Sequence, residues 1–209
     1  IGTNFTTIEN LRVGVMNIGI GNGTFFAGLA GDGGPDFSKP LGEQDLIGFG
    51  FTDFNLGFTM LTPTLSKSLP TFTAAKANVG NFAFLLGGAE TDFIKLTADQ
   101  ISLALNLGGP LVSAAANVLG DATVDFSAFV ETTTDTNSNG TIDPGYRIDT
   151  DTSGNNPVFL DYKGELISIE VTGAVLTLFD FVHITGNFAF QKGPKHIVDI
   201  ATGVPANVG

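Results

Sequence analysis

The sequence contains no cysteine and no tryptophan, and it is poor in positive charge. Without cysteine the chain has no disulfide, no thiolate metal ligand and no cysteine nucleophile. Only 9 Lys and Arg stand against 21 Asp and Glu, which gives a formal net charge of −12. Nucleic acids and anionic membranes attract clustered basic residues, so we expect neither as a partner. No apolar run reaches the roughly 18 residues of a membrane helix, so we expect no membrane insertion.

Residues for the familiar catalytic arrangements are also scarce. His183 and His196 are the only histidines, and neither has a second ligand at metal-binding spacing. The G-x-S-x-G, H-E-x-x-H and P-loop patterns are missing. Asp161 and Glu165 form one carboxylate pair of the kind that glycosidases use, but such pairs arise by chance in so acidic a chain. We therefore expect no enzyme and assign no catalytic or cofactor-binding residue.

The amino-acid composition of the chain is typical of β-structure. It contains 28 Gly and 19 Phe, and many of them occur with Thr in short alternating runs. Between Glu165 and Lys192 the apolar residues keep a period of two, which predicts two long strands. The first strand alternates Ile167, Ile169 and Val171 with Ser168, Glu170 and Thr172, and the second carries Val182, Ile184, Phe188 and Phe190 around Gly186.

Other parts of the chain show the same alternation. It predicts strands over Leu11–Gly23, Asp45–Leu61, Phe72–Leu86, Asp92–Leu107 and Asp121–Val130. Gly28–Glu43 has loop composition, with Asp32 and Asp36 in a weak likeness to calcium-binding nonapeptide turns. Pro110–Leu119 is the one segment with helical composition. At period two, the Phe residues are expected in the core or between stacked sheets.

These patterns predict an all-β fold, elongated and built of long, mostly antiparallel strands, with at most one short helix. Either a two-sheet β-sandwich or a β-solenoid-like stack accommodates them. We expect a single elongated unit over residues 1–209. The sequence GNFAF stands at Gly80–Phe84 and again at Gly186–Phe190, so about 1–107 and 108–209 are candidate pseudo-repeats. Because the chain begins at Ile1 without Met, we expect a processed product or an excerpt of something longer. The uncapped ends and the repeated strand favour one unit of a tandem array.

One loop carries a metal-binding pattern. Its residues fit D-x-N-x-N-G-x-x-D, the first nine positions of an EF-hand-type calcium loop, with oxygen ligands at Asp135, Asn137, Asn139, Thr141 (through its carbonyl) and Asp143. Tyr146 stands where the bidentate Glu belongs, so Asp149 or Asp151 would complete the shell. The alternative is a solvated turn, because Asn, Asp and Gly are ordinary turn formers. The cofactor that this pattern predicts is calcium.

Three stretches resemble the tandem β-strand repeats of giant bacterial surface and secreted proteins. They are IENLRVGV, the segment from Gly145 to Gly193, and HIVDIATG. In that family, strands ending in G-[ND]-F-A-F-x-K-G recur beside calcium-binding modules of the RTX or Calx-beta kind. Gly186–Gly193 matches this ending, whereas Gly80–Phe84 continues as Leu85-Leu86-Gly87. The resemblance implies a long, extracellular, non-catalytic polypeptide used for adhesion, matrix or filament formation.

We therefore expect a structural subunit or repeat of an extracellular bacterial fibre, sheath or adhesin. It would self-assemble through β-strand edges with copies of itself or adjacent repeats, and calcium would stabilise it. The alternative is a carbohydrate- or surface-binding module of a cell-surface protein, with surface glycans as partners. Both readings place the chain outside the cell or on its surface.

Overall fold

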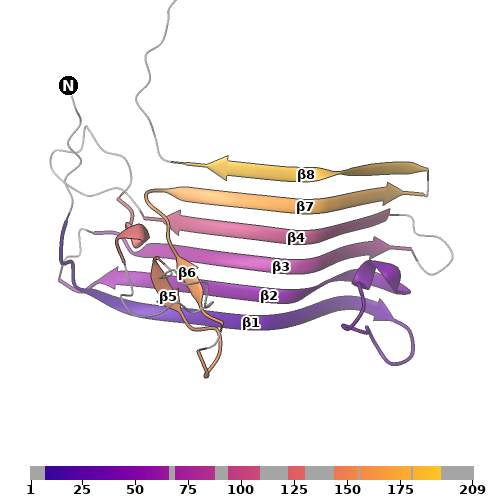
Figure 1. The fold of residues 1–209 in the computed structure, drawn as a ribbon, viewed down its shortest axis with the longest axis horizontal. Coiled ribbons are helices and arrows are strands. Elements are labelled where there is room, and N and C mark those ends of the chain that lie inside the picture. The colour runs from indigo at the N-terminus through magenta and orange to yellow at the C-terminus, as the bar shows by residue number, and fades with distance from the viewer. Residues whose placement is uncertain are drawn as a thin grey trace, which may run out of the picture.

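The computed structural model describes residues 8–65, 69–87, 94–108, 122–129, 144–154, 156–179 and 181–193. Within them, six long strands form one antiparallel sheet in the order β1-β2-β3-β4-β7-β8, and β5 pairs with β6 (Figure 1). The large sheet consists of β1 Val13–Ala30, β2 Leu46–Pro63, β3 Phe72–Leu86, β4 Ile94–Leu107, β7 Leu166–Leu178 and β8 Val182–Lys192. The small hairpin is β5 Tyr146–Ile148 and β6 Val158–Leu160, and two 3-10 turns are η1 Leu41–Glu43 and η2 Phe126–Ala128.

The predicted all-β class and the long antiparallel strands are confirmed. The second layer in the described part of the chain is the short β5–β6 hairpin, which lies across one end of the sheet (Figure 1). Four strands of the large sheet come from residues 1–107 and two from 108–209. The two GNFAF segments lie on β3 and β8, and the division into pseudo-repeats stays a prediction.

Strand pairing sorts the side chains onto two unlike faces. Each residue shares a face with its direct partner on the next strand. On one face, which we call the apolar face, Ile18 pairs with Phe58 and Phe58 with Ala75, and Leu105 follows on β4. On the opposite face, the polar face, Asn78 pairs with Ser102 and Ser102 with Glu170. The alternation that the sequence predicts in these strands is therefore confirmed.

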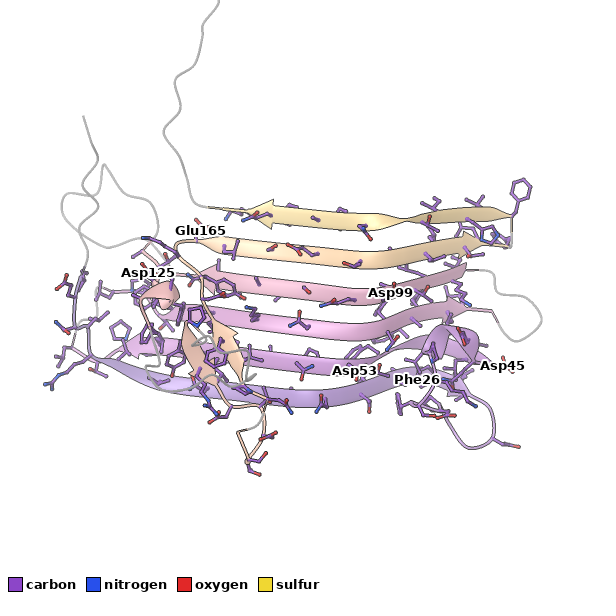
Figure 2. The ribbon with its side chains drawn as sticks, in the orientation of Figure 1. Phe26, Asp45, Asp53, Asp99, Asp125 and Glu165 are labelled. Carbon is purple, nitrogen blue, oxygen red and sulfur yellow. The ribbon has the colours of Figure 1, made fainter. Side chains whose placement is uncertain are left out.

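A line of backbone irregularities crosses the sheet from β1 to β7. Asn22, Asp53 and Asn81 have left-handed backbones with φ of 53°, 54° and 44°, and Gly173 on β7 has φ of 64°. The register shifts at these places, and Figure 1 shows the central strands bending there, with Asp99 of β4 close by (Figure 2). Each extra residue reverses the alternation, which is how a β-bulge acts. The apolar residues on both sides of the bend therefore stay on one face.

The core lies on the polar face, at the two ends of the strands. At one end, hairpin β5–β6 and η2 cover β2 and β3, burying Leu61, Phe72, Ala74, Phe126, Ile148, Val158 and Leu160 together. At the other end, Leu41 of η1 packs on Leu46, Ala83 and Leu85. Asn106 of β4 is fully buried and its amide donates to the carbonyls of Val124 and Gly164, at 2.9 and 2.8 Å. This amide holds the η2 segment and the loop before β7 against the sheet.

The structure differs locally from two of the sequence predictions. A strand over Asp121–Val130 is wrong for the described residues, because Phe126–Ala128 form the 3-10 turn η2. Asp125 causes this difference, since its side chain accepts from the backbone N–H and hydroxyl of Ser127 and closes a local turn. The predicted loop begins later than expected, because β1 continues to Ala30. The predicted helix Pro110–Leu119 lies outside the described residues.

Candidate functional site

Of the predicted calcium ligands, Asp135, Asn137, Asn139, Thr141 and Asp143 lie outside the described residues. Asp149 and Asp151 lie in the turn between β5 and β6. Asp149 accepts a hydrogen bond from the Arg147 guanidinium at 2.8 Å. One oxygen of Asp151 accepts from the backbone N–H groups of Ser153 and Gly154, at 2.8 and 2.6 Å, and from the Ser153 hydroxyl. These bonds give both carboxylates a structural role in the turn.

Within the described residues, these two carboxylates are occupied by protein contacts. A calcium ion takes six to eight oxygen ligands, whereas Asp149 is paired with a positive guanidinium and Asp151 closes its own turn. The described residues contain no group of three His, Cys, Asp or Glu placed to hold a metal. The calcium interpretation therefore depends on residues 135–143 and stays a prediction.

Asp36, in the loop after β1, likewise serves its own turn. It accepts from the Ser38 hydroxyl at 2.6 Å and from the Ser38 backbone N–H at 3.0 Å, and Lys39 lies 3.2 Å away. The Ser38 hydrogen bonds, with the charge of Lys39, lower the pKa of Asp36. These contacts account for Asp36 without a bound ion.

The carboxylates and histidine that we discounted as catalytic groups have ordinary partners. Asp161 pairs with Lys76 at 3.2 Å, and Glu165 pairs with Lys192 at 2.6 Å. The His183 ring on β8 lies 3.1 Å from the Thr177 hydroxyl. Asp161 and Glu165 therefore each face a lysine, which is an arrangement of structural ion pairs.

A polar cleft of about 520 Å³ lies between hairpin β5–β6 and the polar face of the sheet. The sheet contributes Asn22, Asn55, Asn78 and Lys76, and the hairpin side contributes Asn156, Phe159 and Asp161 among others. The Lys76–Asp161 ion pair joins the two walls. Side-chain amides and charged groups form hydrogen bonds with sugars, and here they lie beside an aromatic ring. The lining of the cleft therefore suits a small polar ligand.

The apolar face exposes many large hydrophobic side chains in the described part of the chain. It carries exposed aliphatic and aromatic side chains from one edge of the sheet to the other: Met16, Ile18, Phe25 and Leu29 on β1, Phe49 on β2, Leu103 on β4, and Ile184, Phe188 and Phe190 on β8. Phe25 and Phe49 are each 42% exposed and lie 5.4 Å apart, ring to ring. Phe51 continues this cluster, 5.4 Å from both Phe25 and Phe54.

The sequence pattern predicts Phe residues at period two in the core or between stacked sheets. Phe72 and Phe126 lie in the core, whereas Phe25, Phe49, Phe188 and Phe190 are 42–58% exposed in the single chain. Hairpin β5–β6, η1 and η2 all pack on the polar face, so no described element covers the apolar one. Alternation within a strand predicts that one face is apolar, but it does not predict which element covers that face.

The two edge strands form a third surface. β1 runs for 18 residues without a charged residue or a proline. β8 is exposed along its whole length and carries only His183 and Lys192 as ionisable residues. Natural edge strands are usually kept from pairing by lysines, prolines or short length. Neither edge has such protection along most of its length.

Comparison of the chain with protein-family models, curated proteins and solved structures found no match. Among the described residues, no helix has the length and apolar character to span a bilayer.

Proposed function

We propose that this chain is a structural unit of an extracellular fibre, sheath or adhesin and assembles through the edges of its sheet. The observation that carries the proposal is edge strand β1, 18 residues long with no charge and no proline. An edge of this kind presents a row of backbone donors and acceptors to a further strand. The likeness of Tyr146–Gly203 to bacterial surface repeats supports the extracellular setting.

The strand order suits edge-to-edge addition of further copies. All six strands alternate in direction, so β1 of a second copy lies antiparallel to β8 of the first when the copy is simply translated. Such a head-to-tail contact does not close on itself and generates a filament. Six strands at about 4.8 Å give a repeat of about 29 Å per unit. Translation also keeps every apolar face on the same side.

Adjacent repeats of one polypeptide serve as well as separate copies, since both present β1 to β8. Calcium, bound by residues 135–143, is the proposed stabiliser of the unit. The charge of −12 makes neutralisation by a divalent cation favourable in an extracellular medium.

Electron microscopy of the purified chain, with calcium and after chelation, tests the proposal. We expect filaments with a repeat of about 29 Å perpendicular to the strands. The double variant Thr185→Lys with Ala189→Lys places two charges on edge strand β8 and should leave discrete particles. The control, Ser168→Lys with Thr172→Lys, carries the same charges on interior strand β7 and should still form filaments. Discrete particles from the unmodified chain in both conditions would contradict edge assembly.

The polar cleft favours a second candidate, a carbohydrate-binding module. Its amides and the Lys76–Asp161 pair offer donors and acceptors for sugar hydroxyls. Calorimetric titration with soluble polysaccharide fragments tests this. Lys76→Ala and Asn78→Ala should each weaken binding at least several-fold, whereas Gln100→Ala, on the polar face outside the lining residues, should not. Absence of any binding heat, with the chain still folded, would exclude this function.

A further inference from the structure

The apolar face is large enough to be one half of a stable interface. Six strands at about 4.8 Å are about 29 Å wide, and 11–18 residues per strand at about 3.3 Å give lengths of about 36–59 Å. The face therefore covers more than about 1,000 Å² in projection. The largest apolar patch on a typical monomer is about 300–600 Å², and a standard interface buries about 800 Å² on each partner.

We propose that this face packs against the same face of a second copy, so that two sheets form a sandwich. The charge distribution is compatible with such a partner at this face. The chain carries a net charge of −12, so two copies repel each other over most of their surface, but the charges on the paired strands lie almost entirely outside the apolar face. On the apolar face, the paired positions of β1, β2, β3, β4 and β7 hold no charged residue. Only Lys192, at the end of β8, falls there, and its amine is bonded to Glu165.

A lipid surface is the less suitable occupant. Proteins that lie on bilayers use Lys and Arg toward anionic headgroups and Trp or Tyr at the interface. This chain has 9 Lys and Arg against 21 acidic residues, no Trp and 2 Tyr. A second copy requires none of these anchors.

Part of the apolar face of the central strands is self-complementary in shape. On the apolar face of β3 and β4, three cross-strand pairs each join a small residue to a large one: Ala75 with Leu105, Ala77 with Leu103, and Phe82 with Ala98. A two-fold axis parallel to the strands, between β3 and β4, lays β3 of one copy over β4 of the other at the same height. Ala75 then faces Leu105 of the second copy, and Ala98 faces Phe82 of the second copy. Small residues opposite large ones let two sheets about 10 Å apart interdigitate.

This contact is independent of the edge assembly proposed above. The face and the strand edges are different surfaces, and β1 and β8 remain at the outside of a sandwich formed this way. The sandwich can therefore be tested in a chain whose β8 edge carries the Thr185→Lys and Ala189→Lys pair. Failure of filament growth and failure of face pairing are then separate results.

Sedimentation-velocity ultracentrifugation of that edge-blocked chain is the first measurement. We expect a species of twice the 21.7 kDa chain mass. Ile18→Lys and Leu103→Lys, both on the apolar face, should each give the monomer. Val15→Lys is the matched control, because Val15 lies on the other face of the same strand, is 53% exposed against 45% for Ile18, and should leave the dimer. Circular dichroism confirms that each variant is folded.

A crosslinking measurement does not depend on disruptive variants. The chain has no cysteine, so Ala77→Cys introduces a single thiol near the proposed axis. Facing backbones about 10 Å apart are too far for a direct disulfide, so a short bismaleimide is used. It should convert Ala77→Cys to covalent dimers and leave Val15→Cys monomeric. A monomeric edge-blocked chain, dimers that survive both face lysines, or flotation of the chain with phosphatidylcholine vesicles would overturn the proposal.

Discussion

The Gly19 backbone in β1 lies directly against the backbone carbonyl of Asp149, the residue that follows β5. A β-carbon at Gly19 would overlap that carbonyl and also meet the Cα of Thr150. Glycine is required here because hairpin β5–β6 approaches the sheet at backbone distance.

Gly19→Val should destabilise the protein by about 1–3 kcal/mol or more, because the hairpin must lift away from β1. Gly14→Val is the control in the same strand, since its nearest neighbour, the Thr62 carbonyl oxygen, lies 3.8 Å away. Urea unfolding measures the free energy of both variants. Equal losses in the free energy of unfolding of the two variants would mean that the close approach of the hairpin does not require glycine at Gly19.

The two tyrosines should respond in opposite ways to removal of their hydroxyls. The Tyr162 hydroxyl is buried without a hydrogen-bond partner among the described residues, whereas Tyr146 accepts from the Asn17 amide at 2.9 Å. Tyr162→Phe should therefore leave the free energy of unfolding unchanged or raise it by up to about 1 kcal/mol. Tyr146→Phe should lower it by about 0.5–1.5 kcal/mol. A loss in Tyr162→Phe as large as that in Tyr146→Phe would contradict the prediction.

Tyr162 also predicts a loss of stability in alkali. Burial, with a smaller contribution from the charge of Asp161, raises the pKa of Tyr162 above its usual value. The folded state then holds this proton more tightly than the unfolded state, so the stability is complete below about pH 10 and falls as pH rises beyond it. Urea unfolding from about pH 8 to pH 11 should show this decline. Tyr162→Phe should flatten it, and an unchanged decline would assign the effect to other groups.

The bulge at Asn22 predicts a reversal of ordinary strand preferences. Asn22 is exposed and has φ of 53°, a conformation that costs a β-branched residue about 1–2 kcal/mol. Asn22→Val should therefore be at least about 1 kcal/mol less stable than Asn22→Gly. At Thr24, two residues along the same strand and without a positive φ, the Val variant should be the more stable of the two. Thermal unfolding of the four variants checks the order, and the same order at both positions would argue against the bulge.

Calcium should stabilise the chain through residues 135–143. Addition of calcium at about millimolar concentration should raise Tm, and Asp135→Ala should abolish the rise. Asp45→Ala, an exposed residue directly before β2, is the control and should keep the rise. If calcium raises Tm equally in Asp135→Ala and Asp45→Ala, residues 135–143 do not bind it.

Local alternation accounts for much of what was predictable. In β4 and β7, the apolar runs Ile101–Leu107 and Ile167–Val171 show which residues share a face, and the register confirms both. Two of the bulges also leave a trace in the sequence, because Gly-Asn stands at Gly21-Asn22 and Gly80-Asn81 within alternating runs. Glycine and asparagine tolerate left-handed backbone, so this pair marks an interruption of a strand.

By itself the sequence determined the secondary structure class, the two-faced character of each strand and the absence of thiol chemistry, because these depend on near neighbours in the chain. Only the tertiary structure decided that the hairpin and both 3-10 turns cover the polar face and leave the apolar one open. It also decided that Asp149 is held by Arg147 and Asp161 by Lys76. Such outcomes depend on contacts between residues far apart in sequence, and period-two alternation carries no information about which distant element arrives.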